Sequence, residues 1–149
     1  MAAADIPQAL PRPLLPSDHQ PEHPDMSTPA PILTASADWH WSPTPYPGVD
    51  FTWLRRNPDG GGSALLKLAK GAKLPLHQHP GTEQVFVTAG RLKVGEHVLN
   101  KGDHLFIDAH VPHAVEALQS AVYLTLSEND GVELLEPGQA VSRPLAADG

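Results

Sequence analysis

Residues 71–90 read GAKLPLHQHPGTEQVFVTAG, and this stretch decides both the fold and the chemistry that we expect of the chain. It holds three potential metal ligands, His77, His79 and Glu83. The two histidines are two residues apart, so on an extended strand both side chains leave the same face. The Pro-Gly pair at 80–81 predicts a turn, and Glu83 begins a new apolar run. A strand, a tight turn and a returning strand would therefore direct two imidazoles and one carboxylate to a common point.

The same stretch resembles the first motif of the cupin family. That motif places a glycine, two histidines, a glutamate and a second glycine at fixed spacing. The sequence fills these positions with Gly71, His77, His79, Glu83 and Gly90. Chance would rarely fill all of them in a chain of this composition, so the match is specific. The alternative is a polar turn with solvent-facing histidines, and the completeness of the motif favours a metal site inside a barrel.

A second, weaker resemblance covers residues 102–117, GDHLFIDAHVPHAVEA. Gly102 and His113 occupy the glycine and metal-binding histidine positions of the second cupin motif. The proline and glycine positions of that motif hold Asp108 and His110, and an alanine replaces its asparagine. The second half of the site is therefore degenerate, and the resemblance depends there on Gly102, Asp103 and His113.

Carried over residue by residue, the cupin resemblance implies that one divalent metal ion is bound by His77, His79, Glu83 and His113. Three neutral imidazoles and one carboxylate leave about two positions open on an octahedral ion, for water, substrate or dioxygen. Such an open site is typical of catalysis or ligand capture and not of a structural metal. Fe(II) is the favoured ion, and Zn(II), Mn(II), Ni(II) or Co(II) would suit the same ligands.

The residues around the motifs predict an all-β domain. From residue 63 onwards short apolar runs alternate with turn residues, and no segment keeps a helical apolar period over more than about two turns. We expect a single cupin barrel (a double-stranded β-helix or jelly roll) with an extended N-terminal arm at 32–131. A proline-rich, disordered tail at 1–31 would precede it, and a C-terminal tail at 132–149 would follow. The expected strands are 51–55, 64–69, 74–79, 83–88, 91–94, 97–100, 104–107, 113–117 and 121–126.

Apolar residues beside the ligands predict a substrate pocket. Val85 and Val87 share a strand face with Glu83, and Val115 shares one with His113, so these valines should point towards the metal. A mostly aliphatic cavity would favour a small organic ligand. The expected pocket residues are Val85, Val87, Phe106, Val115 and Tyr123.

Two features leave alternatives open. Asp108 and His110 could supply an acid or base at the pocket mouth, three residues before His113. The preferred interpretation is a surface turn in which Asp108 caps backbone amides and His110 faces solvent. The aromatic stretch at 39–53 could form a lid on the pocket. Here the preferred interpretation is an arm that packs across the outside of the barrel or across a dimer partner.

Composition and charge exclude several classes of function. The net charge of −7 argues against nucleic-acid or anionic-membrane partners, which would require a basic patch. The absence of cysteine rules out a disulfide framework and a thiolate metal site. No apolar run approaches the length of a membrane span, and prolines interrupt the first residues where a secretory signal would need an apolar segment. The expected location is the cytoplasm.

The stretch from Trp41 to Val87 is similar to the ChrR-like branch of cupins. That branch includes the zinc-binding domain of certain anti-sigma factors and small dioxygenases that cleave rings or diketones. The anti-sigma proteins also carry cysteine and histidine zinc ligands in an N-terminal domain, so a chain without cysteine does not fit that role well. The favoured hypothesis is a metal-dependent dioxygenase for a small enol, phenol-like or diketone substrate. The alternatives are a non-oxidative lyase, isomerase or cyclase and a zinc-binding sensor, and the resemblance implies a homodimer.

Overall fold

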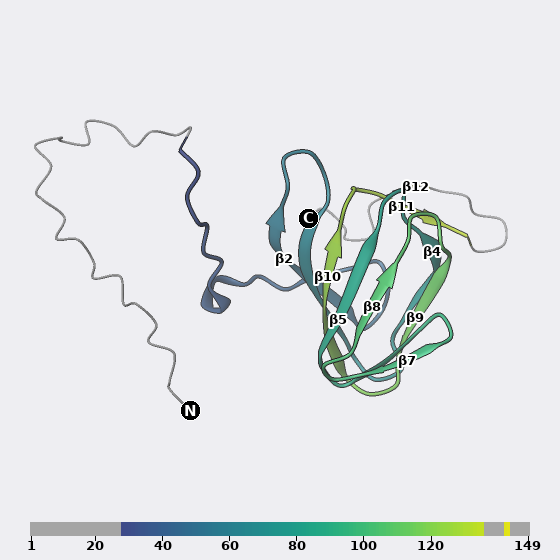
Figure 1. Cartoon of the computed structure of the whole chain (residues 1–149). Coiled ribbons are helices and arrows are strands. Elements are labelled where there is room, and N and C mark those ends of the chain that lie inside the picture. Colours follow the sequence, from purple (N-terminus) through teal and green to yellow (C-terminus); the bar gives the residue numbers. More distant parts are fainter. Residues whose placement is uncertain (1–27, 136–141, 144–149) are drawn as a thin grey trace, which may run out of the picture. The chain divides into compact units, whose positions relative to one another are not determined.

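The computed structural model of the protein describes residues 28–135 and 142–143. The chain divides into two units, Met1–Ile32 and Leu33–Gly149, and every strand among the described residues belongs to the second unit. These strands form two six-stranded antiparallel sheets (Figure 1). In spatial order the first sheet contains β1 (Ser42–Pro43), β2 (Val49–Arg56), β3 (Gly62–Leu68), β10 (Ala121–Ser127), β5 (Glu83–Ala89) and β8 (His104–Ile107). The second contains β12 (Ser142–Arg143), β11 (Val132–Leu134), β4 (Lys73–Gln78), β9 (His113–Ala117), β6 (Arg91–Val94) and β7 (His97–Asn100).

The core lies between the inner faces of the two sheets. In β5 the buried side chains are Glu83, Val85 and Val87, which are every second residue. In β9 the same alternation buries His113 and Val115. This period of two is what a strand with one buried face requires. The candidate ligands Glu83 and His113 therefore occupy inward positions at the start of their strands, in line with core residues, and the all-β jelly-roll prediction is confirmed.

The strand predictions agree closely with the structure. Four expected strands, 91–94, 97–100, 104–107 and 113–117, coincide with β6, β7, β8 and β9 at both ends. Beyond residue 131, the expected C-terminal limit of the barrel, β11 continues the second sheet and pairs with β4. Its three residues are too few to reveal a period in the sequence. The helical content of the described residues is limited to one 3-10 turn, η1 (Ser36–Asp38).

The N-terminal arm lies on the outer face of the first sheet. Thr34 Oγ1 donates a hydrogen bond to the Leu54 carbonyl oxygen at 2.9 Å. The Lys67 ammonium stands 4.4 Å from the centre of the Trp41 ring, which is a cation–π distance. Because Lys67 is exposed between the core residues of β3, Trp41 must lie outside the barrel. The part of the aromatic stretch that contains Trp41 therefore packs against the outside of the barrel of its own chain, as the preferred interpretation expected.

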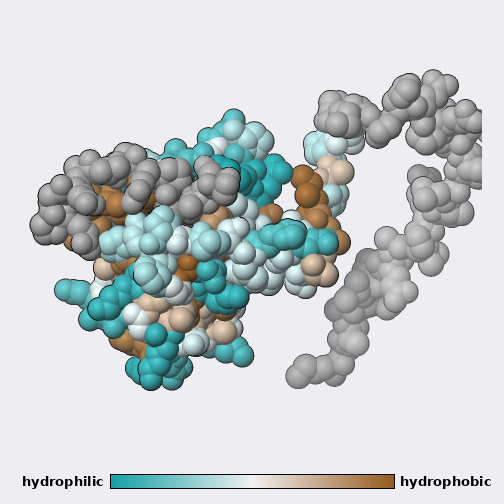
Figure 2. Space-filling view, turned by 180° about the vertical axis from the view of Figure 1, so that it is seen from behind, coloured by the Kyte–Doolittle hydropathy of each residue, from teal (hydrophilic) through white to brown (hydrophobic). Residues whose placement is uncertain are grey.

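Some expectations fall outside the described part of the chain. Residues 1–27 of the predicted N-terminal tail lie there, as do 136–141 and 144–149 of the predicted C-terminal tail. Within the described residues, no helix has the length and apolar character needed to cross a membrane. On the side seen in Figure 2, hydrophilic residues predominate on the coloured surface and hydrophobic ones occur in small separate groups.

Candidate metal centre

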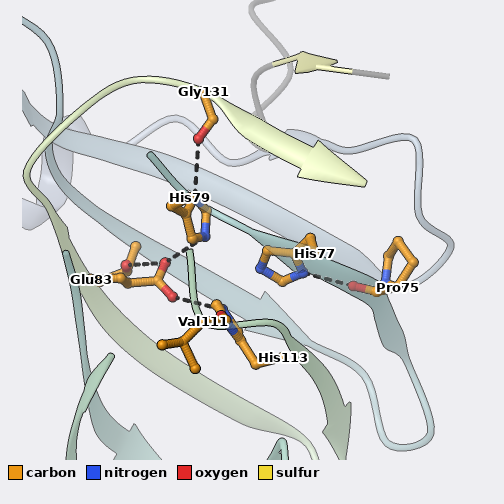
Figure 3. Close-up of polar contacts among 8 residues, drawn as sticks. Pro75, His77, His79, Glu83, Val111, His113 and Gly131 are labelled. Atoms are coloured by element: carbon orange, nitrogen blue, oxygen red, sulfur yellow. Dashed lines mark hydrogen bonds and ion pairs between the residues drawn. The ribbon is translucent and has the colours of Figure 1, made fainter. Parts of the chain in front are cut away.

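Four side chains from three strands meet inside the barrel (Figure 3). His77 lies in β4 and His79 directly follows that strand, while Glu83 begins β5 and His113 begins β9. His77 and His113 are direct partners across the β4–β9 ladder. One nitrogen or oxygen atom from each of the four residues lies within 4.8 Å of the others, and all four side chains are buried. The structure thus brings together the complete set of ligands predicted from the sequence.

The Pro-Gly turn that separates the histidines from Glu83 is tightly enclosed. Gly81 is buried, and a Cβ atom there would collide with the side chain of Asn129. The carbonyl oxygen of His79 accepts a hydrogen bond from the backbone N–H of His110 at 2.8 Å. The turn is therefore held from two other loops, which fixes the direction in which His79 and Glu83 leave the backbone.

Each histidine donates one ring hydrogen bond to a backbone carbonyl oxygen. The Nδ1 atoms of His77, His79 and His113 lie 2.7, 3.0 and 2.9 Å from the carbonyl oxygens of residues 75, 131 and 111. A carbonyl oxygen can only accept, so each Nδ1 carries the proton. In the neutral rings the Nε2 lone pairs are then free for a metal ion. Such contacts also fix the tautomer and orientation of metal-binding histidines.

Glu83 contacts His79, His113 and Thr125 through its two carboxylate oxygens. Its Oε1 lies 3.1 Å from His113 Nε2, and its Oε2 lies 3.4 Å from His79 Nε2 and 2.9 Å from Thr125 Oγ1. Burial alone would raise the pKa of Glu83, but the hydrogen bond with His113 and the nearby histidines outweigh it and hold the pKa below its usual value. Burial would also lower the pKa of His113, and the contact with Glu83 raises it overall. In the metal-free protein the pair thus favours a charged contact.

The donor set fits a divalent cation. His79 Nε2 is buried and has no hydrogen-bond partner, which is costly for a polar atom inside a protein. Its lone pair points into the same cluster as the other ligand atoms, within the 4.8 Å span of the group. Three imidazoles and a carboxylate suit Fe(II), Zn(II) and related ions. A cation among these atoms would satisfy the unpaired nitrogen, and the identity of the ion is not set by the ligands.

We expect His77 to destabilise the metal-free protein as the pH falls from 7 to 5. Burial, followed by the charge of His113, lowers the pKa of His77 from 6.5 to about 4. At His77 the unfolded chain therefore binds more protons than the folded protein between these values, so this residue makes acidification favour unfolding, while the raised pKa of His113 acts in the opposite direction. Over this pH range His77 contributes a loss of about 2 kcal/mol. Urea denaturation at pH 7 and pH 5 measures the free energy of unfolding, and its decrease on acidification should be larger by that amount in the wild type than in His77→Asn. Equal decreases in the two proteins would contradict a lowered pKa of His77.

A cavity of about 200 Å³ opens beside the cluster. His79 and Glu83 form part of its wall, and apolar side chains from β2 and β3 form another part. Towards one side the wall becomes polar, with Arg56 from the end of β2 and Asp130 from the loop after β10. The full lining is Trp53, Arg56, Gly61, Gly62, Ala64, Leu66, His79, Glu83, Thr125, Ser127, Asn129, Asp130 and Gly131.

None of the five expected pocket residues lines this cavity. Val85, Val87, Val115 and Tyr123 point inward as predicted, but they are part of the packed core. Phe106 is 52% exposed and its side chain faces outward, because Leu105 and Ile107 take the inward positions of β8. The cavity is lined instead by side chains such as Trp53, which comes from the aromatic stretch considered as a lid. Its sequence neighbours carry no motif, so only the alternation of β2 could have indicated which aromatic faces inward.

Asp108 and His110 lie on the surface. Both side chains are exposed, and the Val111 N–H approaches the Asp108 carbonyl oxygen at 3.4 Å. His110 has a φ of 62°, a conformation that occurs mainly in turns. These features agree with the exposed surface turn that the sequence analysis preferred, whereas capping of backbone amides by the Asp108 side chain stays a prediction. Neither residue lines the cavity beside the cluster.

Two antiparallel sheets closed around three inward-facing histidines and a glutamate define the protein as a cupin. More narrowly, the family model of the ChrR cupin-like domain matches residues 29–130, and the chain belongs to that family. No curated protein sequence matches the chain significantly.

Solved structures of low sequence identity share the fold. An acetylacetone dioxygenase from Acinetobacter johnsonii superposes with a TM-score of 0.65 and 14% identity, over 83% of this chain and 90% of that one. A candidate acetylacetone dioxygenase from Methylibium petroleiphilum gives 0.66 and 16%, over 78% and 90%. The complex of SigE with the anti-sigma ChrR from Rhodobacter sphaeroides gives 0.55 and 23%, over 63% and 51%. At these identities the similarity demonstrates the fold alone.

Proposed function

We propose that this chain is a mononuclear metal-dependent dioxygenase for a small enol, phenol-like or 1,3-diketone substrate, with Fe(II) as the favoured ion. The observation that carries the proposal is the direct contact between the ligand cluster and a partly apolar cavity, since His79 and Glu83 belong to both. A closed structural metal site would have no such opening. The similarity to the acetylacetone dioxygenase of Acinetobacter johnsonii supports the choice of a diketone as the first substrate to test.

The cavity restricts the substrate by size and polarity. Its volume of about 200 Å³ lies below the range of about 300–1,000 Å³ that drug-sized ligands occupy, so the substrate is small. Trp53, Ala64 and Leu66 provide an apolar wall that would orient a carbon skeleton and exclude water. An ion held by the four ligands would supply Lewis-acid polarisation of chelating oxygens and, for iron, redox chemistry with dioxygen. The chain itself contributes orientation and a dry surface.

Oxygen uptake by Fe(II)-loaded protein tests this proposal. With acetylacetone as the first of a panel of small diketones, enols and catechols, we expect oxygen uptake to match the loss of substrate. Zn(II)-loaded protein is the matched control and should consume no oxygen. A fully iron-loaded protein that consumes no oxygen with any member of the panel would contradict the proposal.

The same experiment separates the alternatives. Substrate loss that continues under nitrogen would indicate a lyase, isomerase or cyclase that uses the ion as a Lewis acid. Tightly bound zinc without turnover, together with a ligand-induced change in association state, would indicate a sensor. The fold shared with the anti-sigma ChrR supports keeping the sensor as a second candidate function.

We also propose that the protein is a homodimer that uses the outer face of β5, β8 and β10. Phe86, Phe106 and Leu126 are each more than 40% exposed and lie on that face in adjacent strands, around the hydrogen-bonded side chains of Gln84 and His104. Exposed apolar side chains grouped in this way favour association. Light scattering should give the mass of a dimer for the wild type and that of a monomer for Phe106→Asp. Val98→Asp, which alters an equally exposed residue on β7, should remain dimeric. A monomeric wild type would contradict the proposal.

A further inference from the structure

Thr125 places a hydroxyl group at an inward position of β10 where the fold would accept an apolar side chain. Ala121 and Tyr123, the preceding inward residues of the same strand, belong to the hydrophobic core. Valine has nearly the same shape as threonine and would fit the strand equally well. A buried hydroxyl is unfavourable unless it forms a hydrogen bond. The hydroxyl of Thr125 therefore requires an explanation in terms of its partner.

That partner is the carboxylate of Glu83. Thr125 Oγ1 donates a hydrogen bond to Glu83 Oε2 at 2.9 Å, and both side chains are buried. The other oxygen, Oε1, lies 3.1 Å from His113 Nε2. Each carboxylate oxygen faces one ligand imidazole, Oε2 at 3.4 Å from His79 Nε2, but only Oε2 also has a hydroxyl donor fixed beside it. A carboxylate that binds a metal through both oxygens would have to turn both towards the ion.

We propose that Thr125 is a positioning residue that restricts Glu83 to coordination through one oxygen. Two-oxygen coordination would use a further position on the ion, and the Thr125 hydrogen bond keeps that position available for a ligand. Both Thr125 and Glu83 line the cavity, so the position would open onto it. The inference rests on the metal centre of the proposed function and does not depend on which reaction that centre catalyses.

Solvent-proton relaxation by Mn(II)-loaded protein tests the role, because its strength follows the number of exchangeable waters on the ion. With about two open positions in the wild type, we expect Thr125→Val to reduce the relaxation enhancement by about half. Thr125 contacts the ligand Glu83 and not the ion itself, and loss of such a contact typically lowers metal affinity by roughly 10–100-fold. We therefore expect Thr125→Val to bind Mn(II) more weakly by that factor. Thr125→Ser keeps the hydroxyl and should restore both values.

Thr52→Val is the matched control, because Thr52 is equally buried but lies in β2 and is absent from the cavity wall. It should leave both measurements unchanged. Wild-type relaxation in Thr125→Val would overturn the inference, as would a Thr125→Ser variant that behaves like Thr125→Val. If Thr125→Val binds no Mn(II), normal loading and relaxation in Thr125→Ser support the role, and their loss overturns it. No substrate is present, so failure here leaves the dioxygenase proposal intact, and a failed substrate screen leaves this inference intact.

Discussion

We expect the wild type to contain close to one metal ion per chain and the His113→Ala variant to contain far less. The affinity of the variant for the metal should be lower by at least about 100-fold. Contacts behind a metal ligand are typically worth 10–100-fold in affinity, so removal of a ligand itself should cost more. His113 also holds Glu83 through the 3.1 Å contact between Nε2 and Oε1. The variant therefore removes one donor and releases a second. Elemental analysis of untagged wild type and variant, both purified without added metal, measures the difference.

His97→Ala is the control for this experiment, because His97 is exposed on β7 and should not affect metal content. Circular dichroism of both variants would show that the barrel is intact. Near-stoichiometric iron in the wild type would favour the dioxygenase, and zinc would favour a Lewis-acid enzyme or a sensor. Metal retained in His113→Ala at the wild-type level would show that the cluster is not the binding site.

Several strands could be predicted because inward and outward residues alternate within them, as in β5 and β9. That signal is local, and it located β6 to β9 at both ends. It fails for the shortest strands, whose structure depends on a partner far away in the sequence. Leu134 of β11, for example, is positioned opposite His77 of β4. It also fails in β8, where three successive apolar residues leave the inward face undecided and packing selects Leu105 and Ile107 over Phe106.

The ligands were visible in the sequence because a strand, a turn and a strand place three of them within one motif. The cavity was not visible, because its wall is assembled from β2, β3, β10 and the loop that follows β10. Thr125 and Trp53 reach the site only when β10 and β2 take their places beside β5 and β3. Alternation correctly turned Val85 and Val87 inward, but it could not distinguish a core position from a position on the cavity wall.

The two glycines of the first motif are expected to differ greatly in their tolerance of alanine. Gly71 and Gly90 both lie between a strand of the first sheet and a strand of the second, with φ of 86° and 76°. Alanine costs about 1–2 kcal/mol in this conformation. At Gly71 no atom lies within 4 Å of an added Cβ, so Gly71→Ala should cost only that amount. At Gly90 the added Cβ would collide with the backbone at Ser120 and Ala121.

That backbone cannot easily give way, because Ala121 begins β10 and pairs with Leu68 of β3. Displacing it would also disturb the strand that carries Thr125 to the ligand cluster. We therefore expect Gly90→Ala to lower the free energy of unfolding by at least about 3 kcal/mol, from the conformational cost and the collision together. Urea denaturation of the two metal-free variants provides the comparison. Equal losses in the free energy of unfolding would mean that the left-handed backbone conformation alone sets the cost of alanine at both positions. The corner at Gly90 would then open without disturbing β10.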